Sequence, residues 1–256
     1  MRKRTSAVVA LTVTVMAFCG RLAAQVKDAQ PSTPAEPRKE DQLRTRTALI
    51  DDSKDAARRP DGAIALFNGK NLDGWTFVLD DKKAKMEDVW AVREGGLLYC
   101  KGRPRGYLRT KRDDFANYEL TLEWRWPPGT KGGNNGVLVH TTDPGVLGIW
   151  PRSHEIQLNN GHAGDIWVIG TMIEIPNPEG RIKERRHLNL TDGSEKPLGE
   201  WNKLRIVCEG DELTIYVNGD KVNYASKLSQ TKGAICLQSE GAEIEYREIL
   251  LRPLKK

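Results

Sequence analysis

The segment YELTLEWRW, residues 118–126, alternates strictly between apolar and polar side chains. Apolar residues occupy every second position from Tyr118 to Trp126, and charged or hydroxyl-bearing residues stand between them. A period of two is typical of a β-strand that packs one face on a core and turns the other face away from it. The segment therefore predicts a half-buried strand.

Short runs of the same kind continue to the end of the chain, separated by Gly, Pro, Asn and Asp. The sequence VNGD at 217–220 is typical of a hairpin turn, and no long segment with helical periodicity follows residue 60. Many short strands without an internal repeat favour an all-β sandwich of two antiparallel sheets over residues 61–254. The side chains expected between the sheets are Leu120, Leu122, Trp124, Ile156, Leu158, Ile206 and Leu237.

The first sixty residues have a different composition. Residues 1–24 combine a basic start, an apolar run and small residues before a cleavage point after Ala24, which is typical of a secretory signal peptide. The apolar run is too short for a membrane-spanning helix. A lipid anchor on Cys19 is the less favoured alternative, because Phe18 is bulky for a lipid-attachment site. Residues 25–60, rich in Pro and charge, predict a flexible linker, so we expect a protein exported to the periplasm or beyond.

The net charge of +5 depends largely on this leader. The whole chain has 40 Lys and Arg against 35 Asp and Glu, whereas residues 1–24 hold four bases and no acids, which leaves +1 for the remainder. Such a balance argues against a nucleic-acid partner. The run RIKERRH at 181–187 is interpreted as a solvated loop rather than a binding patch.

Three cysteines remain after residue 24, namely Cys100, Cys208 and Cys236, and their spacing is not that of a metal site. Cys208 and Cys236 lie in apolar runs and are expected to be buried thiols. One disulfide is compatible with export, and the sequence does not select its pair.

Eight segments occur in an order that resembles the 3-keto-disaccharide hydrolase domain family across residues 61–254. They are LFNGKNLDGW (66–75), VWAVREGGLL (89–98), YLRTKRDDFANYELTLEWRW (107–126), GGNNGVLVH (132–140), EIQL (155–158), GEWNKLRIVCEG (199–210), LTIYVNG (213–219) and LQSEGAEIEYREILL (237–251). The resemblance implies a concanavalin A-like jelly-roll sandwich. It also implies an enzyme acting on 3-keto-disaccharides or 3-keto-glycosides.

The chemistry implied by the resemblance needs few groups. A ketone at C3 acidifies the C2 proton, so a modest base can form an enolate that expels the group at C1, after which water can add. Such a route requires a base, a stabiliser for the enolate oxygen and a proton donor for the departing alcohol. It does not require the close carboxylate pair of ordinary glycosidases.

Glu155 and Gln157 share one face of the expected strand at 153–158, while Ile156 and Leu158 share the other. This shared face and the resemblance together predict that Glu155 is ionised and is the catalytic base, with Gln157 on sugar hydroxyls. His140 has the parity of Leu138 at a strand end and is a second catalytic candidate, although a packing histidine remains open. Equally open is a plain solvent-facing strand at Glu155.

Other polar and aromatic residues are weaker candidates. Arg125 is considered as a catalytic stabiliser and Glu123 as a substrate contact, yet both could simply pair across strands. Asp165 follows a glycine and could be a ligand or a turn former. Trp150 and Trp167 border loops near the expected sugar face and are candidates for stacking on a sugar ring.

A divalent metal held by Glu155, Asp165 and His140 is conceivable, but no compact ligand spacing supports it. The sequence therefore leaves three functions open: an enzyme acting on 3-keto sugars, a carbohydrate-binding module without catalysis, and an envelope protein with a structural role. The oligomeric state is not encoded in any feature of the sequence.

Overall fold

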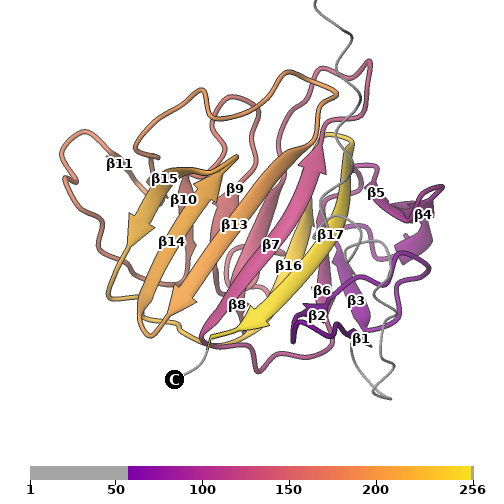
Figure 1. Cartoon of the computed structure of the whole chain (residues 1–256), viewed down its shortest axis with the longest axis horizontal. Coiled ribbons are helices and arrows are strands. Elements are labelled where there is room, and N and C mark those ends of the chain that lie inside the picture. The colour runs from indigo at the N-terminus through magenta and orange to yellow at the C-terminus, as the bar shows by residue number, and fades with distance from the viewer. Residues whose placement is uncertain (1–56, 255–256) are drawn as a thin grey trace, which may run out of the picture. The chain divides into compact units, whose positions relative to one another are not determined.

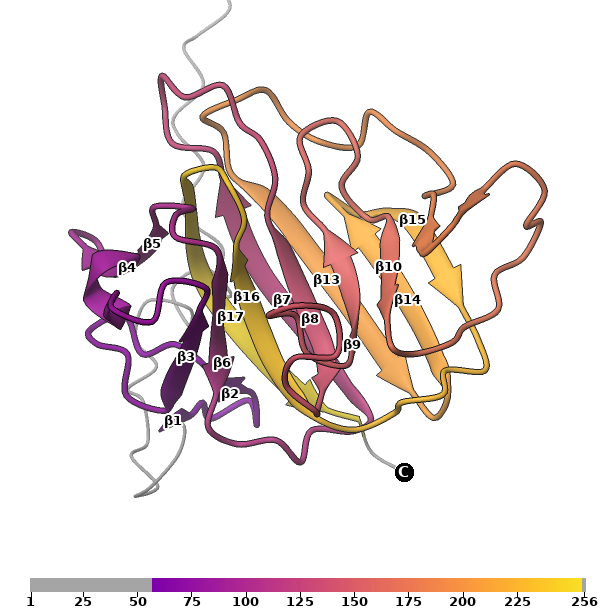
Figure 2. The same cartoon turned by 180° about the vertical axis from the view of Figure 1, so that it is seen from behind.

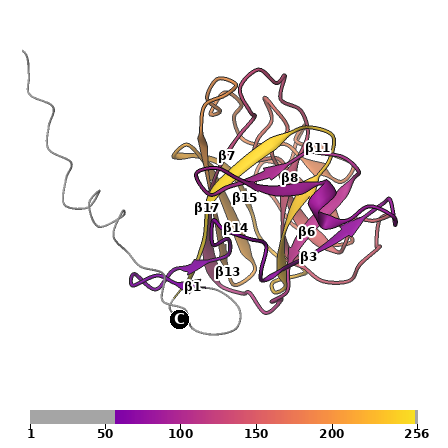
Figure 3. The same ribbon diagram turned by 90° about the vertical axis from the view of Figure 1, so that its right-hand side faces the viewer.

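The computed structural model describes residues 57–254, and the predicted signal peptide and most of the predicted linker lie outside this range. Within it the chain forms two antiparallel sheets that face each other, shown edge-on in Figure 3. One short 3₁₀ helix, η1 (Met86–Asp88), interrupts the strands. The architecture is the concanavalin A-like jelly-roll sandwich that the sequence predicts.

The first sheet, called sheet A, faces the viewer in Figure 1. Its main path runs through β1 (Ala57–Arg58), β2 (Ile64–Ala65), β17 (Ile244–Pro253), β7 (Tyr118–Arg125), β13 (Asn202–Glu209), β14 (Glu212–Val217) and β15 (Asp220–Ala225). β5 (Leu97–Cys100) adds to β17, and β4 (Trp90–Arg93) adds to β5. The strand β1 lies at the end of the segment expected to be linker.

The second sheet, sheet B, faces the viewer in Figure 2. Its order is β11 (Ile182–Lys183), β12 (Arg186–His187), β10 (Ile166–Ile169), β9 (Ser153–Gln157), β8 (Gly136–Thr141), β16 (Ala234–Ser239), β6 (Gly106–Thr110) and β3 (Trp75–Leu79). Neighbours in this order come from distant parts of the chain. The sheet therefore brings residues 107, 136, 155 and 238 onto one surface.

The core between the sheets follows from strand alternation. In β7 the pattern of buried and half-buried residues repeats with a period of two, so its apolar side chains point inward. All seven side chains predicted for the core are at most 1% exposed, which confirms that prediction. Cys208 and Cys236 are buried thiols, as predicted, and Cys100 is a third.

One local departure from alternation matters later. His140 near the end of β8 has a positive φ of 53°, a conformation that few non-glycine residues adopt. The pairing of β16 with β8 shifts register between Ala234 and Cys236, next to this point. The irregularity turns the His140 side chain out of the alternation that its position in the sequence predicts.

No helix within residues 57–254 is long and apolar enough to cross a membrane.

Candidate functional site

Two rows of side chains run across the outer face of sheet B. Residue pairing places Arg109, Cys236, Leu138, Glu155, Trp167 and Arg186 in successive positions of one row. The adjacent row contains Tyr107, Gln238, Gly136 and Gln157. Because side chains of a strand alternate between its faces, Ile156 enters the core and Glu155 and Gln157 lie on the outer face together, as predicted.

Glu155 is the buried acid at the centre of this face, with only 6% of its surface exposed. Gly136 lies in the adjacent row on β8, and its lack of a side chain leaves the space that the carboxyl of Glu155 occupies. A Cβ at Gly136 would lie 3.0 Å from Oε1 of Glu155 and 2.5 Å from Oε1 of Gln238. Glycine at this position therefore lets two polar side chains from neighbouring strands meet above the sheet.

Burial raises the pKa of Glu155 to about 8, and the negative charge of Glu240 acts in the same direction. Contact with Gln238 and the positive charge of Arg185 oppose the shift without cancelling it. The sequence predicts an ionised Glu155, and this pKa moves its ionisation toward pH 8. The side chain is mainly protonated at pH 7 and becomes a carboxylate near pH 8.

Gln238 is fully buried beside Glu155. Neither amide atom makes a hydrogen bond of good geometry within the described part of the chain, although the side chain lies close enough to lower the pKa of Glu155. A buried amide without partners costs free energy, so such groups call for an explanation. An amide can donate to a carboxylate or accept from a protonated acid, and it can also serve a ligand in the same place.

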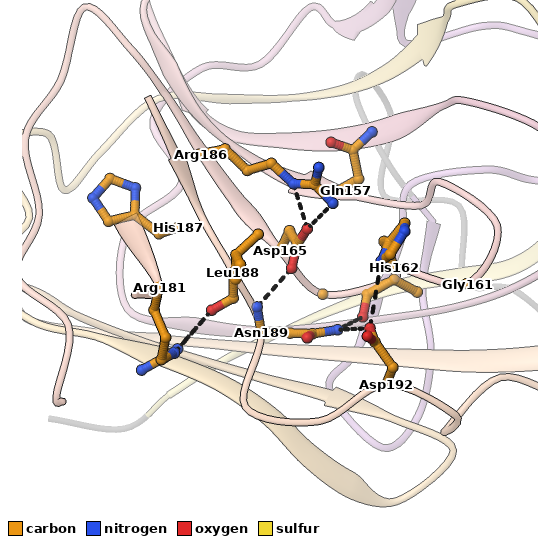
Figure 4. Close-up of polar contacts among 12 residues, drawn as sticks. Gln157, Gly161, His162, Asp165, Arg181, Arg186, His187, Leu188, Asn189 and Asp192 are labelled. Carbon is orange, nitrogen blue, oxygen red and sulfur yellow. Dashed lines mark hydrogen bonds and ion pairs between the residues drawn. The ribbon is translucent and has the colours of Figure 1, made fainter. Parts of the chain in front are cut away.

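An acid and an arginine fix the edge of this face, as Figure 4 shows. Asp165 is 1% exposed and accepts from Nε of Arg186 and from the backbone N–H of Asn189, both at 2.6 Å. These contacts attach β12 and the loop after it to the turn before β10. Asp165 therefore acts as an anchor, and the same figure shows His162 on a separate contact with Asp192.

Aromatic side chains lie on both sides of Glu155. Trp167 on β10 is its direct register partner and is half-buried. The loop between β8 and β9 brings Trp150 over Tyr107, with ring centroids 6.3 Å apart, in a small apolar cluster that includes Leu138. Burial raises the pKa of Tyr107 to about 12, so its hydroxyl is neutral over the physiological range. Flat rings beside buried polar groups are a usual setting for a sugar.

Residues 62–252 match the model of the 3-keto-alpha-glucoside-1,2-lyase-like domain, which is most of the chain. The protein belongs to this family. The family is one of carbohydrate-active domains, and the fold and the site described above belong to its matched region.

The chain is also similar to individual proteins of known sequence or structure. A 3-keto-disaccharide hydrolase of Bacteroides thetaiotaomicron is 23% identical to it, with 76% of this chain and 79% of the relative covered. A candidate glycosyl hydrolase of Parabacteroides distasonis has a crystal structure that superposes with a TM-score of 0.52 at 25% identity, covering 72% of this chain and 96% of that one. A second from the same species superposes with a TM-score of 0.55 at 18% identity, covering 76% and 95%.

The fold places Arg125 and Glu123 away from Glu155. Both residues lie on β7 in sheet A, where Arg125 pairs with Glu245 at 2.8 Å and Glu123 pairs with Arg247 at 2.6 Å. The expectation that they share a site with Glu155 is wrong, because alternation tells which face a side chain takes and does not tell which sheet its strand joins.

His140 is also separated from Glu155. Its ring lies 5.6 Å from the ring of Tyr118 and 6.2 Å from that of His154, both on the inner side of their strands. Burial lowers the pKa of His140 to about 4 and that of His154 to about 3. The positive φ of His140 turns its side chain to the inner side of the sheet. The prediction that His140 lies beside Glu155 is therefore wrong, and the alternative of a packing histidine is correct.

A metal bound by Glu155, Asp165 and His140 does not fit these positions. Asp165 is occupied by Arg186 and Asn189, and His140 lies on the inner side of the sheet. Within residues 57–254 no group of three His, Cys, Asp or Glu side chains could hold a metal ion.

The sequence analysis did not single out Tyr107, Gly136, Gln238 or Glu240, which surround the candidate site on this face. The alternation of AICLQS, residues 234–239, already separates Cys236 and Gln238 from Ile235 and Leu237, so Gln238 could have been found. Glu240 follows the strand in a turn fixed by Asn135, whose Oδ1 accepts from the Glu240 N–H at 3.1 Å. No sequence pattern reveals that contact.

Proposed function

We propose that this protein is an enzyme that cleaves glycosides whose sugar carries a ketone at C3, and that Glu155 removes the C2 proton. The observation that carries the proposal is the buried Glu155 carboxyl, held above Gly136 beside the unpartnered amide of Gln238. A base works best when its pKa lies near the pH of operation, and the pKa of Glu155 is about 8. The C2 proton is acidified by the ketone, so no stronger base is needed.

The proposed reaction is an elimination followed by an addition. The Glu155 carboxylate takes the C2 proton, and the electrons of the C–H bond form the enolate of the C3 ketone. The enolate then expels the C1 substituent, which leaves a double bond between C1 and C2 and an alkoxide that takes up a proton. Protonated Glu155 can return its proton to this alkoxide, and addition of water across the double bond completes hydrolysis.

Amides supply the polar contacts that hold the sugar. Gln238 can donate to the enolate oxygen, a stabilisation that a water-poor setting strengthens. Gln157 donates from Nε2 to Asn134 and keeps its own oxygen for a sugar hydroxyl. Because Glu155 is only 6% exposed, the side chains over it must move aside when a sugar binds.

The test uses a chromogenic 3-keto-glucoside and the variant Glu155→Gln. This change keeps the shape and the hydrogen-bonding capacity of the side chain and removes the basic oxygen. Release of the chromophore should fall by about 10²–10⁴-fold, while binding of the sugar is retained. Incorporation of solvent deuterium at C2, followed by NMR, should fall in parallel because it reports proton removal directly.

The matched control is Glu119→Gln on sheet A, where Glu119 pairs with Arg205 at 2.8 Å. It makes the same chemical change away from Glu155 and should leave both rates unchanged. Wild-type turnover by Glu155→Gln would remove Glu155 as the base. A wild-type protein that binds the sugar but neither releases the chromophore nor exchanges C2 would instead be a carbohydrate-binding module without catalysis.

A further inference from the structure

A basic hairpin lies at the edge of sheet B next to the proposed site. Strands β11 and β12 contribute Lys183 and Arg186, which are register partners, and Arg185 stands in the turn between them. Arg186 is also the register partner of Trp167 on β10. The row that contains Glu155 and Trp167 therefore continues directly onto this hairpin.

The two adjacent arginines have different environments. Arg186 pairs with the buried carboxylate of Asp165 at 2.6 Å, which neutralises its charge and anchors the hairpin. Arg185 is exposed and makes no ion pair with any described residue. Its carbonyl accepts from the N–H of Val168 at 3.0 Å, so its backbone is fixed while its guanidinium stays free.

The free guanidinium is directed toward the site. It lies over the ring of Trp167, 5.4 Å from the ring centroid, within the range of a cation–π contact. Its charge reaches Glu155, because it opposes the rise in the pKa of that residue. Lys183 adds a second charge with no ion pair in the described part of the chain, and the nearest acid in sequence, Glu184, is exposed in the turn.

We infer that Arg185, supported by Lys183, forms a subsite for an anionic group on the glycoside, so that the preferred substrate is an acidic sugar. The inference rests on the proposed function, in which a sugar ring lies beside Trp167 and Glu155. A guanidinium presents its donors in a planar fork that matches a carboxylate, a sulfate or a phosphate. The alternative is that the hairpin is only a solvated loop, in which case neutral and acidic sugars bind equally.

The experiment measures binding of four aryl glycosides by calorimetry at low ionic strength. They are a glucoside, the corresponding glucuronide, and the glucoside bearing a 6-sulfate or a 6-phosphate. At least one anionic ligand should bind about tenfold more tightly than the neutral glucoside, and added salt should reduce the difference. Comparison of the three anionic arms tells a carboxylate from a sulfate or a phosphate.

Arg185→Gln should abolish this preference and leave the affinity for the neutral glucoside unchanged. The matched control is Lys221→Gln on sheet A, which removes a cation that also lies over an aromatic ring, 4.7 Å from the centroid of Tyr224, and should keep the preference. Equal affinities in the wild type, absence of binding by all four ligands, or a preference that survives Arg185→Gln would overturn the inference.

Binding is measured without turnover, so failure of the two proposals can be told apart. A preference that depends on Arg185 in a protein without activity on any 3-keto sugar would support the subsite and remove the proposed reaction. Turnover of 3-keto-glucosides without any preference for acidic sugars would do the reverse.

Discussion

The outer faces of the two sheets carry similar residues in opposite states. On sheet A both carboxylate oxygens of Glu245 are used, one by Arg125 at 2.8 Å and one by Arg93 at 3.0 Å. Trp201 lies between Arg125 and Arg247, with the guanidinium carbons 4.6 and 4.1 Å from its ring centroid. On sheet B the buried carboxyl of Glu155 makes no ion pair with any described residue, and neither amide atom of Gln238 makes a hydrogen bond within that part of the chain.

The difference separates structural polar groups from functional ones. A paired charge on a surface has satisfied its interactions within the protein and has little left for a ligand. A buried polar group without partners lowers stability, and a reaction or a ligand is one explanation for keeping it. Sheet A therefore supports the sandwich, and sheet B holds the candidate site.

Among the tests of this difference between the two sheets, the pH dependence of catalysis should show the largest effect. Because the base must be ionised and the pKa of Glu155 is about 8, kcat/KM should rise with pH through that value and fall about tenfold per pH unit below it. Glu240→Gln removes a neighbouring negative charge and should move the midpoint to lower pH. A rate that is flat between pH 6 and 9, measured on a 3-keto-glucoside, would contradict a role for Glu155.

The second prediction concerns the contact between Glu155 and Gln238 above Gly136. In Gly136→Ala the new methyl group would lie 2.5 Å from Oε1 of Gln238 and 3.0 Å from Oε1 of Glu155. Overpacking of this kind costs about 1–3 kcal/mol of stability, and displacement of the base by about 1 Å can cost about 10²-fold in rate.

The double variant Gly136→Ala with Gln238→Ala relieves the shorter contact. It should recover melting temperature without recovering kcat/KM, since the amide is then absent. Full activity in the single variant would mean that the position of Glu155 above Gly136 is unimportant.

The sequence predicts the direction of most strand side chains but not the contrast between the two sheets. Alternation gave the directions of Leu122, Ile156 and Glu155 correctly, because the direction of a side chain in a regular strand is local. It failed at His140, where a positive φ reverses the side chain. It also could not place Arg125, because the choice of sheet depends on pairing of β7 with β13 and β17, which are distant in sequence.

The raised pKa of Glu155 was beyond prediction for a similar reason. It depends on burial in the assembled sheet and on the charge of Glu240, which lies more than 80 positions away in the chain. The local sequence around residue 155 predicts a polar strand face and does not tell how deeply that face is buried from solvent. Only the assembled sheet supplies it.

The third prediction concerns the inner side of sheet B. Burial lowers the pKa of His140 to about 4 and of His154 to about 3, so the unfolded chain binds protons more readily than the folded one. The stability from keeping them neutral is complete above about pH 6.5 and is lost as pH falls through the folded values. Because a difference of one in pKa corresponds to about 1.4 kcal/mol, the two histidines together should lower the free energy of unfolding by several kcal/mol in strong acid.

Denaturant unfolding at a series of pH values measures this loss. His154→Phe keeps a ring of similar size and removes the titration, so its stability should depend less on pH between 6.5 and 4. His162→Gln is the matched control, because His162 is exposed, and it should follow the wild-type curve. A wild-type stability that does not change over this range would contradict the buried, neutral pair.

The smallest expected effect belongs to the paired face of sheet A. Glu123→Gln breaks the contact with Arg247, in which both side chains are about a third exposed (30% and 41%), and exposed pairs contribute about 0–1 kcal/mol. Arg125→Gln should cost somewhat more, because Glu245 is 4% exposed and would keep only Arg93. Neither residue lies on the sheet that carries Glu155, so kcat/KM on a 3-keto-glucoside should stay within about twofold of wild type for both.

The informative result is the combination of kcat/KM with the melting temperature. A large fall in kcat/KM at unchanged melting temperature would mean that the sugar binds on sheet A, and that satisfied ion pairs do not mark the structural face of this fold.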